Sequence, residues 1–217
     1  MDQTIFHLIN EHWTNGFFDY LMPIVSATEI WKPFFLIAFA LALVFGGFRG
    51  RACVICVMII LLAGGEVTHF LKTAVNRRRP KQVDFVRMVE LAKVKPAILK
   101  AFHKPTARFS DQSDRNLARS GPSFPSGHTT NNTIIALCLT LFYPGRGWLY
   151  WIVTALVGYS RVYLGAHWPS DVVATLFLAA GETLLMLGLF ELAWRYLSAR
   201  WLPALNHRHP SLLGLGV

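Results

Sequence analysis

The stretch that decides the fold of this chain is ACVICVMIILLAGGEVTHFLKTAV, residues 52–75. It is apolar along most of its length and exceeds the ~20 residues that an α-helix needs to cross a bilayer. A β-strand with unpaired edges cannot satisfy its backbone polar groups in lipid, whereas a helix can. The stretch therefore predicts a membrane-spanning helix.

Other apolar runs repeat this pattern in the 217-residue chain, of which 53% is hydrophobic and only 15% charged. A soluble domain carries about a quarter charged residues. The runs predict five spans, at residues 30–46, 52–75, 129–142, 148–163 and 171–196. We therefore expect an all-α integral membrane protein, a bundle of about six helices that forms a single domain over residues 1–217.

The sixth helix of this expectation is N-terminal, and residues 1–28 allow more than one form for it. Apolar residues between positions 5 and 9 recur at helical spacing, which suits a helix in the membrane interface. The apolar part 17–27 is short and contains Asp19 and Pro23. It is therefore either a sixth span or a half-inserted segment.

Basic residues indicate the orientation of the bundle. An alternating topology places five arginines on one side: Arg49, Arg51, Arg146, Arg195 and Arg200. Short cytoplasmic loops are rich in Lys and Arg, so this side is expected to be cytoplasmic. The long segment 81–124 then forms an extracytoplasmic loop. Its part 85–102 mixes apolar and basic residues, and we expect either an amphipathic segment on the lipid headgroups or a solvated loop.

The net charge of +9 could indicate nucleic acid as a partner. Most basic residues, however, lie between the apolar runs, which favours topology signals, anionic headgroups or an anionic substrate instead. We therefore expect the lipid bilayer as a partner and no nucleic acid. No His/Cys set has the spacing of a zinc site, so we expect no metal and no other cofactor.

The first cluster of candidate site residues closes the span 52–75 and contains Lys72, Arg79 and Pro80. Lys72 and Arg79 are seven residues apart, so they would share one helix face if the helix continued that far. Pro80 disfavours helical backbone at Arg79, which indicates that the helix ends near it. The two cations suit one phosphate, and a basic anchor for lipid headgroups is the alternative.

The second cluster, Pro125-Ser126-Gly127-His128, lies directly before the span 129–142. Free amides at a helix start bind anions. Gly127 allows close approach of the backbone to a ligand, and Ser126 adds a hydroxyl donor. The alternative is a simple helix-start turn with an interfacial histidine.

The third cluster, which contains Ser160, Arg161, His167 and Asp171, joins the last two spans. Pro169 suits the first turn of a helix, so His167 and Asp171 would lie one turn apart. A carboxylate that accepts a hydrogen bond from an imidazole leaves the other ring nitrogen free to attack. A capped helix start with a structural His–Asp pair is the alternative.

In order, the clusters read K-x6-R-P, P-S-G-H and S-R-x5-H-x3-D over residues 72–171. This pattern resembles the three-part signature of the type 2 phosphatidic acid phosphatase superfamily, which includes membrane lipid phosphatases and soluble vanadium haloperoxidases. Every signature position is matched. The predicted spans resemble the membrane branch, and the short chain resembles its bacterial members.

The resemblance implies a role for each residue. His167 would be the nucleophile that forms a phosphohistidine, Asp171 would orient it, and His128 would protonate the leaving oxygen and then activate water. The phosphate would be bound by Lys72, Arg79, Ser126, Gly127 and Arg161. The implied activity is metal-independent hydrolysis of a lipid phosphomonoester or diphosphate.

Candidate substrates are undecaprenyl diphosphate, lipid A 1-phosphate, phosphatidylglycerol phosphate and phosphatidic acid, and no residue discriminates among them. The implied location is the bacterial inner membrane, with a multi-pass chain whose site faces the periplasm or the cell exterior. Two alternatives are a relative of the soluble haloperoxidases and a non-enzymatic lipid-binding membrane protein. The sequence indicates no oligomeric state.

Overall fold

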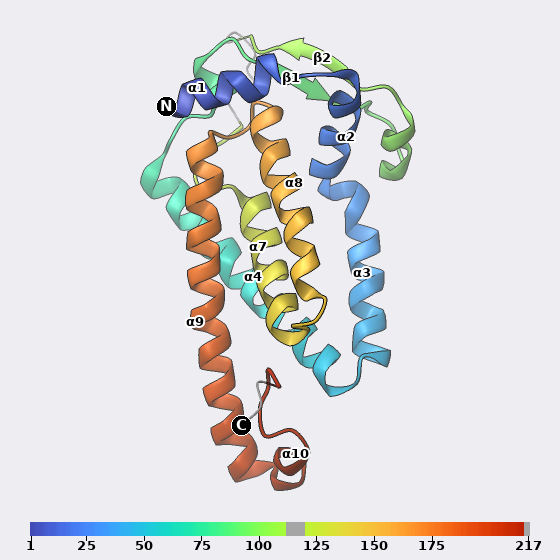
Figure 1. Cartoon of the computed structure of the whole chain (residues 1–217), viewed down its shortest axis with the longest axis vertical. Helices are drawn as coiled ribbons and strands as arrows, with labels where there is room; N and C mark the ends of the chain where they lie inside the picture. Colours follow the sequence, from blue (N-terminus) through green and yellow to red (C-terminus); the bar gives the residue numbers. More distant parts are fainter. Residues whose placement is uncertain (112–119, 215–217) are drawn as a thin grey trace.

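The computed structural model describes residues 1–111 and 120–214. Within them, long helices run along the longest axis of the molecule (Figure 1). These helices are α3 (Thr28–Phe45), α4 (Gly47–Val75), α7 (Gly127–Phe142), α8 (Tyr150–Tyr163) and α9 (Pro169–Trp201). α7 is central, because it packs against α4, α8 and α9. The five predicted apolar runs are thus helical, with ends within a few residues of those expected.

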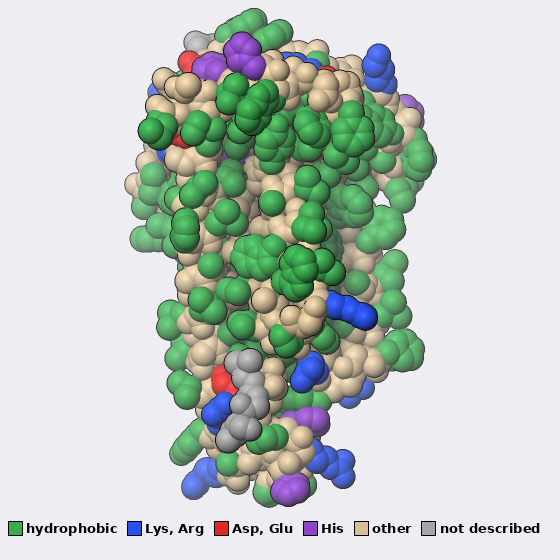
Figure 2. All heavy atoms as spheres, viewed as in Figure 1, with side chains coloured by type: hydrophobic (Ala, Val, Ile, Leu, Met, Phe, Trp, Pro, Cys, Tyr) green, Lys and Arg blue, Asp and Glu red, His purple; other side chains and the backbone are tan. Residues whose placement is uncertain are grey.

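Three of these helices, α3, α4 and α9, are long and apolar enough to cross a membrane. α7 and α8 have 16 and 14 residues, fewer than the ~20 of a full crossing. On the face in Figure 2, hydrophobic side chains cover the middle of the molecule, and most charged side chains gather toward its two ends. The predicted class, an all-α integral membrane protein, is confirmed, while the number of crossings stays a prediction.

The core of the bundle lies between α4, α7 and α9. Ile60, Ile134, Phe142 and Leu187 are almost completely buried there. Gly64 lets α4 and α7 approach each other closely at the edge of this core. A Cβ atom at this position would lie only 2.9 Å from Ile134 Cδ1. The helices that carry the site are therefore held by close packing.

The N-terminal segment lies across one end of the bundle (Figure 1). It contains α1 (Asp2–His7), the π-helix η1 (Leu8–His12) and α2 (Gly16–Ser26). α2 has 11 residues, too few to cross a bilayer, which argues against the sixth span. The buried Asn10 side chain anchors this segment, because it donates hydrogen bonds to Arg87 O (2.8 Å) and Tyr163 O (2.7 Å).

The segment 81–124 contains a small antiparallel sheet that the sequence did not predict. Strand β1 (Arg87–Glu90) pairs with β2 (Thr106–Phe109), with Arg87 opposite Phe109. Residues 112–119 of the expected loop lie outside the described residues. Contact with lipid headgroups stays a prediction. The remaining short elements are α5 (Pro80–Val83), η2 (Ala97–Phe102), η3 (Gly147–Leu149) and α10 (Pro203–Arg208).

The two ends of the bundle differ in what they carry. The α3–α4 turn, the connection from α7 to α8 and the end of α9 lie at one end, and with them the five arginines of the orientation argument. α1, β1, β2 and all three clusters lie at the other end (Figure 1). The chain therefore brings the clusters to the same end.

Candidate functional site

The three clusters meet through contacts between segments far apart in the sequence. Arg79 Nη1 donates to Ala166 O (2.9 Å), which joins the first cluster to the third. The backbone N–H of Ser126 donates to Thr175 Oγ1 (3.1 Å), which joins the second cluster to α9. One site is therefore assembled from the end of α4, the start of α7 and the α8–α9 connection.

Arg79 enters the site from the segment that follows α4, not from the helix itself. The helix ends because Asn76 has a left-handed backbone with φ of 46°. Arg79 is extended before Pro80, as the proline predicts. Its side chain is 8% exposed, and its Nε donates to Gly121 O (3.0 Å).

His167 lies in the α8–α9 connection and is 2% exposed. Its Nε2 is 3.2 Å from Arg79 Nη1. Because a guanidinium only donates hydrogen bonds, Nε2 must be the acceptor. A neutral imidazole in this arrangement carries its proton on Nδ1, so the lone pair of Nε2 faces the arginine.

The surroundings of His167 favour its neutral form. Burial, followed by the positive charges of Arg161, Arg79 and Lys72, holds the pKa of His167 well below its usual range. The same three cations also act electrostatically on His128, so both histidines lie within reach of one set of charges. The imidazole is therefore available as a nucleophile at neutral pH.

The expected hydrogen bond between His167 and Asp171 is not formed. His167 Nδ1 and Asp171 Oδ2 are 4.0 Å apart, and Nδ1 has no hydrogen-bond partner among the described residues. The reason is that the carboxylate caps the start of α9: Oδ2 accepts from the Trp168 N–H (3.0 Å) and from the Ser123 hydroxyl. The interaction between the two side chains is therefore electrostatic in this state.

Two hydroxyls that the sequence did not single out contact the site from the N-terminal segment. Arg161 Nη1 donates to Ser26 Oγ, and His128 Nε2 is 3.0 Å from Thr28 Oγ1. Arg161 Nε is buried without a hydrogen-bond partner among the described residues. The sequence signal for these contacts was weak, since a hydroxyl residue before a span is also an ordinary helix start.

The start of α7 leaves space for a ligand beside Gly127, while Ser126 has a structural role. Its Oγ caps the helix by accepting from the backbone N–H of Thr129 (3.5 Å), and it also accepts from Thr129 Oγ1 (3.0 Å). Gly127 is open, because a Cβ atom at this position would lie 3.9 Å from its nearest neighbour, Thr68 Cγ2. Lys72 is partly buried and makes no hydrogen bond or ion pair with a described residue, so its charge is available to a ligand.

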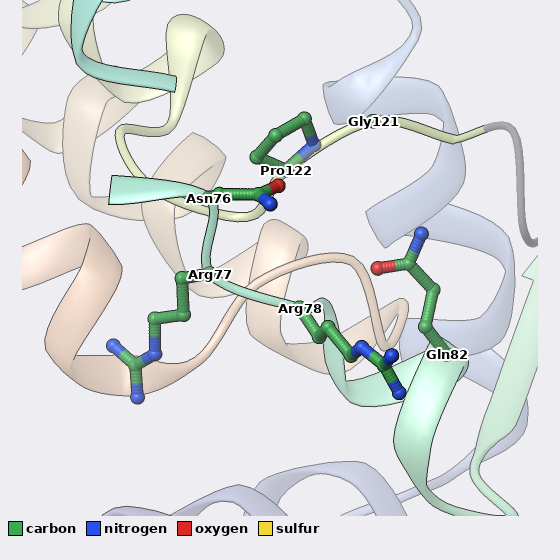
Figure 3. A pocket seen from close by; sticks show the side chains of 6 residues that line it. All are labelled: Asn76, Arg77, Arg78, Gln82, Gly121 and Pro122. Atoms are coloured by element: carbon green, nitrogen blue, oxygen red, sulfur yellow. The ribbon is translucent and has the colours of Figure 1, made fainter. Parts of the chain in front are cut away.

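Two hollows flank these residues. The larger, of about 560 Å³, is lined by apolar side chains and by the polar or charged residues Ser26, Glu90, Lys93, Arg108 and Arg161. The smaller, of about 360 Å³, lies beside the 76–78 segment (Figure 3). The larger hollow adjoins the cation cluster and has a mixed polar and apolar lining, which suits the part of a ligand next to its phosphate.

The arrangement has the parts needed for phosphoryl transfer. Fixed cations stabilise the charge that develops on the non-bridging oxygens. The cations here are Lys72, Arg79 and Arg161, and they surround an imidazole that is neutral and buried. The structure thus brings together the residues that the sequence proposed for one phosphate site.

Comparison with known proteins points to the same chemistry. The sequence profile of the PAP2 superfamily matches residues 51–195. The lipid A 4'-phosphatase of Porphyromonas gingivalis is 38% identical over 96 residues, which are 43% of this chain and 39% of that protein. The undecaprenyl-diphosphatase of Sulfolobus acidocaldarius is 49% identical over 53 residues, 24% of this chain and 26% of that protein. The chain thus spans less than half the length of these relatives.

A solved structure has the same fold. The crystal structure of LpxE from Aquifex aeolicus superposes with a TM-score of 0.58 and 20% identity, over 86% of this chain and 94% of that one. At this identity the likeness concerns the fold. The family profile, in contrast, covers more than half of the chain and includes all three clusters. The chain belongs to the PAP2 superfamily.

Proposed function

We propose that this chain is a membrane lipid phosphatase that hydrolyses a phosphomonoester or diphosphate through a phosphohistidine on His167. The observation that carries the proposal is the position of Nε2. It accepts a hydrogen bond from Arg79, and three cations whose charge a phosphate would neutralise act electrostatically on the same imidazole. A lone pair directed at an anion site is the geometry that attack on phosphorus requires.

In the proposed reaction, Nε2 attacks phosphorus and the bond from phosphorus to the leaving oxygen breaks. Burial and then the positive charges of Arg161, Arg79 and Lys72 hold the pKa of His128 below its usual range, and a bound phosphate offsets those charges so that His128 can be protonated. His128 then donates this proton to the leaving oxygen, and later takes a proton from the water that cleaves the phosphohistidine. Lys72, Arg79 and Arg161 stabilise the charge on the non-bridging oxygens. The negative charge of Asp171, 4.0 Å from Nδ1, stabilises the imidazolium that forms.

We propose a lipid as the substrate because the site lies at the end of a bundle of apolar helices. The relatives act on lipid A and on undecaprenyl diphosphate, as their names state. The 560 Å³ hollow beside Arg161 would receive the headgroup portion next to the phosphate. The candidates are the phosphates of lipid A and of undecaprenol, phosphatidylglycerol phosphate and phosphatidic acid.

Phosphate release from these four lipids tests the proposal, with purified protein in detergent micelles and EDTA present. We expect His167→Ala to abolish release from whichever lipid is hydrolysed, while the protein still folds and inserts. His207→Gln is the matched control, because His207 is exposed and lies in α10, at the end of the bundle away from the site. Full activity in His167→Ala would exclude the mechanism, and no release from any lipid by the wild type would favour a binding protein.

We also propose that the site faces away from the cytoplasm, in the bacterial inner membrane. The five arginines at the opposite end support this orientation. The exposed residues Lys104, at the site end, and His207, at the other, offer a test. In spheroplasts, a membrane-impermeant maleimide should label Lys104→Cys and spare His207→Cys, and the three native thiols are buried. Labelling of His207→Cys but not of Lys104→Cys would show that the site faces the cytoplasm.

A further inference from the structure

Arg77 lies two residues before Arg79, within the first cluster, but it was not proposed as a site residue and the proposed reaction does not use it. It follows the turn at Asn76 that ends α4. Figure 3 shows that the side chains of Arg77 and the neighbouring Arg78 diverge from one another. Arg77 reaches the start of α9, whereas the Arg78 side chain bonds to no described residue.

The guanidinium of Arg77 joins two carboxylates. Its Nη1 donates to Asp171 Oδ1 (2.6 Å) and to Ser170 Oγ (2.8 Å). Its Nη2 donates to Asp2 Oδ2 (2.7 Å). Asp2 in turn accepts from the backbone N–H of Ser170 (2.9 Å), so α1 is attached to the first turn of α9 at the same place.

Charge makes this contact important for Asp171. Asp171 is fully buried, and a buried carboxylate needs a partner that compensates its charge. Among the described residues, Arg77 is the one Lys or Arg that hydrogen-bonds to it. Burial raises the pKa of Asp2, but hydrogen bonds from Ser170 and Arg77 outweigh this effect and hold its pKa below the ordinary value. Asp2 is therefore ionised at neutral pH and fixes the far side of Arg77.

We propose that Arg77, held by Asp2, is a positioning residue for Asp171, so that α1 supports the site. The proposal rests on the proposed function, because the position of Asp171 affects turnover only if His167 reacts. Arg77 holds Oδ1 and thereby leaves Oδ2 as the oxygen nearest His167 Nδ1. It also keeps the carboxylate from turning toward Arg79, where it would neutralise a cation that the phosphate needs.

The test is steady-state kinetics of Arg77→Gln on the lipid that the wild type hydrolyses. We expect kcat to fall about 10- to 100-fold, the range seen when a residue that orients a metal ligand through a hydrogen bond is removed. KM should change less than about twofold, because Arg77 does not touch the phosphate. Arg77→Lys should recover part of the lost kcat, and Asp2→Asn should lower kcat by a smaller factor. Arg78→Gln is the control and should match the wild type.

These measurements distinguish a failure of the positioning role from a failure of the phosphatase proposal. If the wild type is active, His167→Ala is inactive and Arg77→Gln keeps its kcat, the positioning role is wrong and the phosphatase proposal stands. If the wild type releases phosphate from no lipid, both fail. If Arg77→Gln does not fold, the Asp2→Asn variant provides the test. An unchanged kcat in Asp2→Asn overturns the role of α1, whereas a lowered kcat at unchanged KM supports it.

Discussion

The carboxylates of Asp171 and Glu191, both on α9, are held by the same kinds of hydrogen-bond donor but face different groups. Asp171, at the start of the helix, accepts from Arg77 (2.6 Å) and from a backbone N–H. Glu191, toward the other end, accepts from Arg195 (2.6 Å) and from the backbone N–H groups of Leu212 (2.8 Å) and Leu213 (3.1 Å). Each is thus a largely buried carboxylate with one arginine and backbone donors.

The difference lies in what each carboxylate faces. Asp171 is 4.0 Å from the imidazole of His167, which is surrounded by cations. Glu191 instead holds the C-terminal segment against the bundle, where Leu213 is buried. The hydrogen bonds that fix a carboxylate therefore do not make it catalytic. In the proposed mechanism the catalytic role depends on a reactive neighbour, and the pair offers matched variants on one helix.

The largest effect is expected for Asp171→Asn. The amide is isosteric but has no charge to stabilise the imidazolium, so kcat should fall by about 10³-fold or more, as for the aspartate of other His–Asp pairs. Phosphate release by the purified variant measures this, with thermal unfolding in detergent as a check on folding. A kcat near that of the wild type would remove the distinction between the two carboxylates.

The next effect is expected for Lys72→Met. Removing this cation should lower kcat/KM about 10²-fold at neutral pH, the usual effect of losing one transition-state donor. It should also raise the pKa of His167, which burial and then the cations hold down. Because only the unprotonated imidazole attacks, the acidic limb of the kcat/KM profile should move to higher pH. A limb that stays in place, or moves to lower pH, would contradict the electrostatic account.

Glu191→Gln should affect stability and leave turnover unchanged. The new amide group faces backbone donors, so a buried hydrogen bond is lost at a cost of ~1–3 kcal/mol. Residues 209–214 should then exchange backbone amide hydrogens faster, as mass spectrometry after deuterium exchange would show. A kcat reduced as much as in Asp171→Asn would mean that any buried carboxylate on α9 supports the site, and would break the comparison.

The smallest effect is expected for Arg195→Gln. The Arg195 side chain is 49% exposed, and an ion pair with such a partner contributes less than ~1 kcal/mol. Thermal unfolding should therefore move by less than in Glu191→Gln, with kcat unchanged. A larger destabilisation than in Glu191→Gln would show that Arg195, and not the backbone donors, holds this end of the chain.

The sequence alone predicted much of the candidate site. Arg79, His167 and the Ser126–His128 turn were identified from residue type and spacing, and the structure places them together. The prediction of a hydrogen bond between His167 and Asp171 was wrong. Spacing indicates that two side chains are one turn apart, but it does not indicate that the helix start will use the carboxylate as its cap.

The side-chain contacts between segments far apart in the sequence could not be predicted in this way. Arg77 and Asp171 are 94 residues apart in sequence, Thr28 and His128 are 100 apart, and Ser26 and Arg161 are 135 apart. None has a local pattern that distinguishes it from an ordinary cap or surface charge. The small sheet of β1 and β2 was missed for the same reason, since two short strands need each other to be recognisable.

What the sequence determined by itself is the set of apolar helices and which candidate site residues lie at their ends. A helix in lipid satisfies its backbone internally, so apolar length is enough to predict it. The tertiary structure alone decided which oxygen of Asp171 faces His167, how Arg77 and Asp2 hold it, and that α1 lies over the site. These features depend on distances between side chains that only packing brings together, because a buried charge takes whichever partner the fold places within reach.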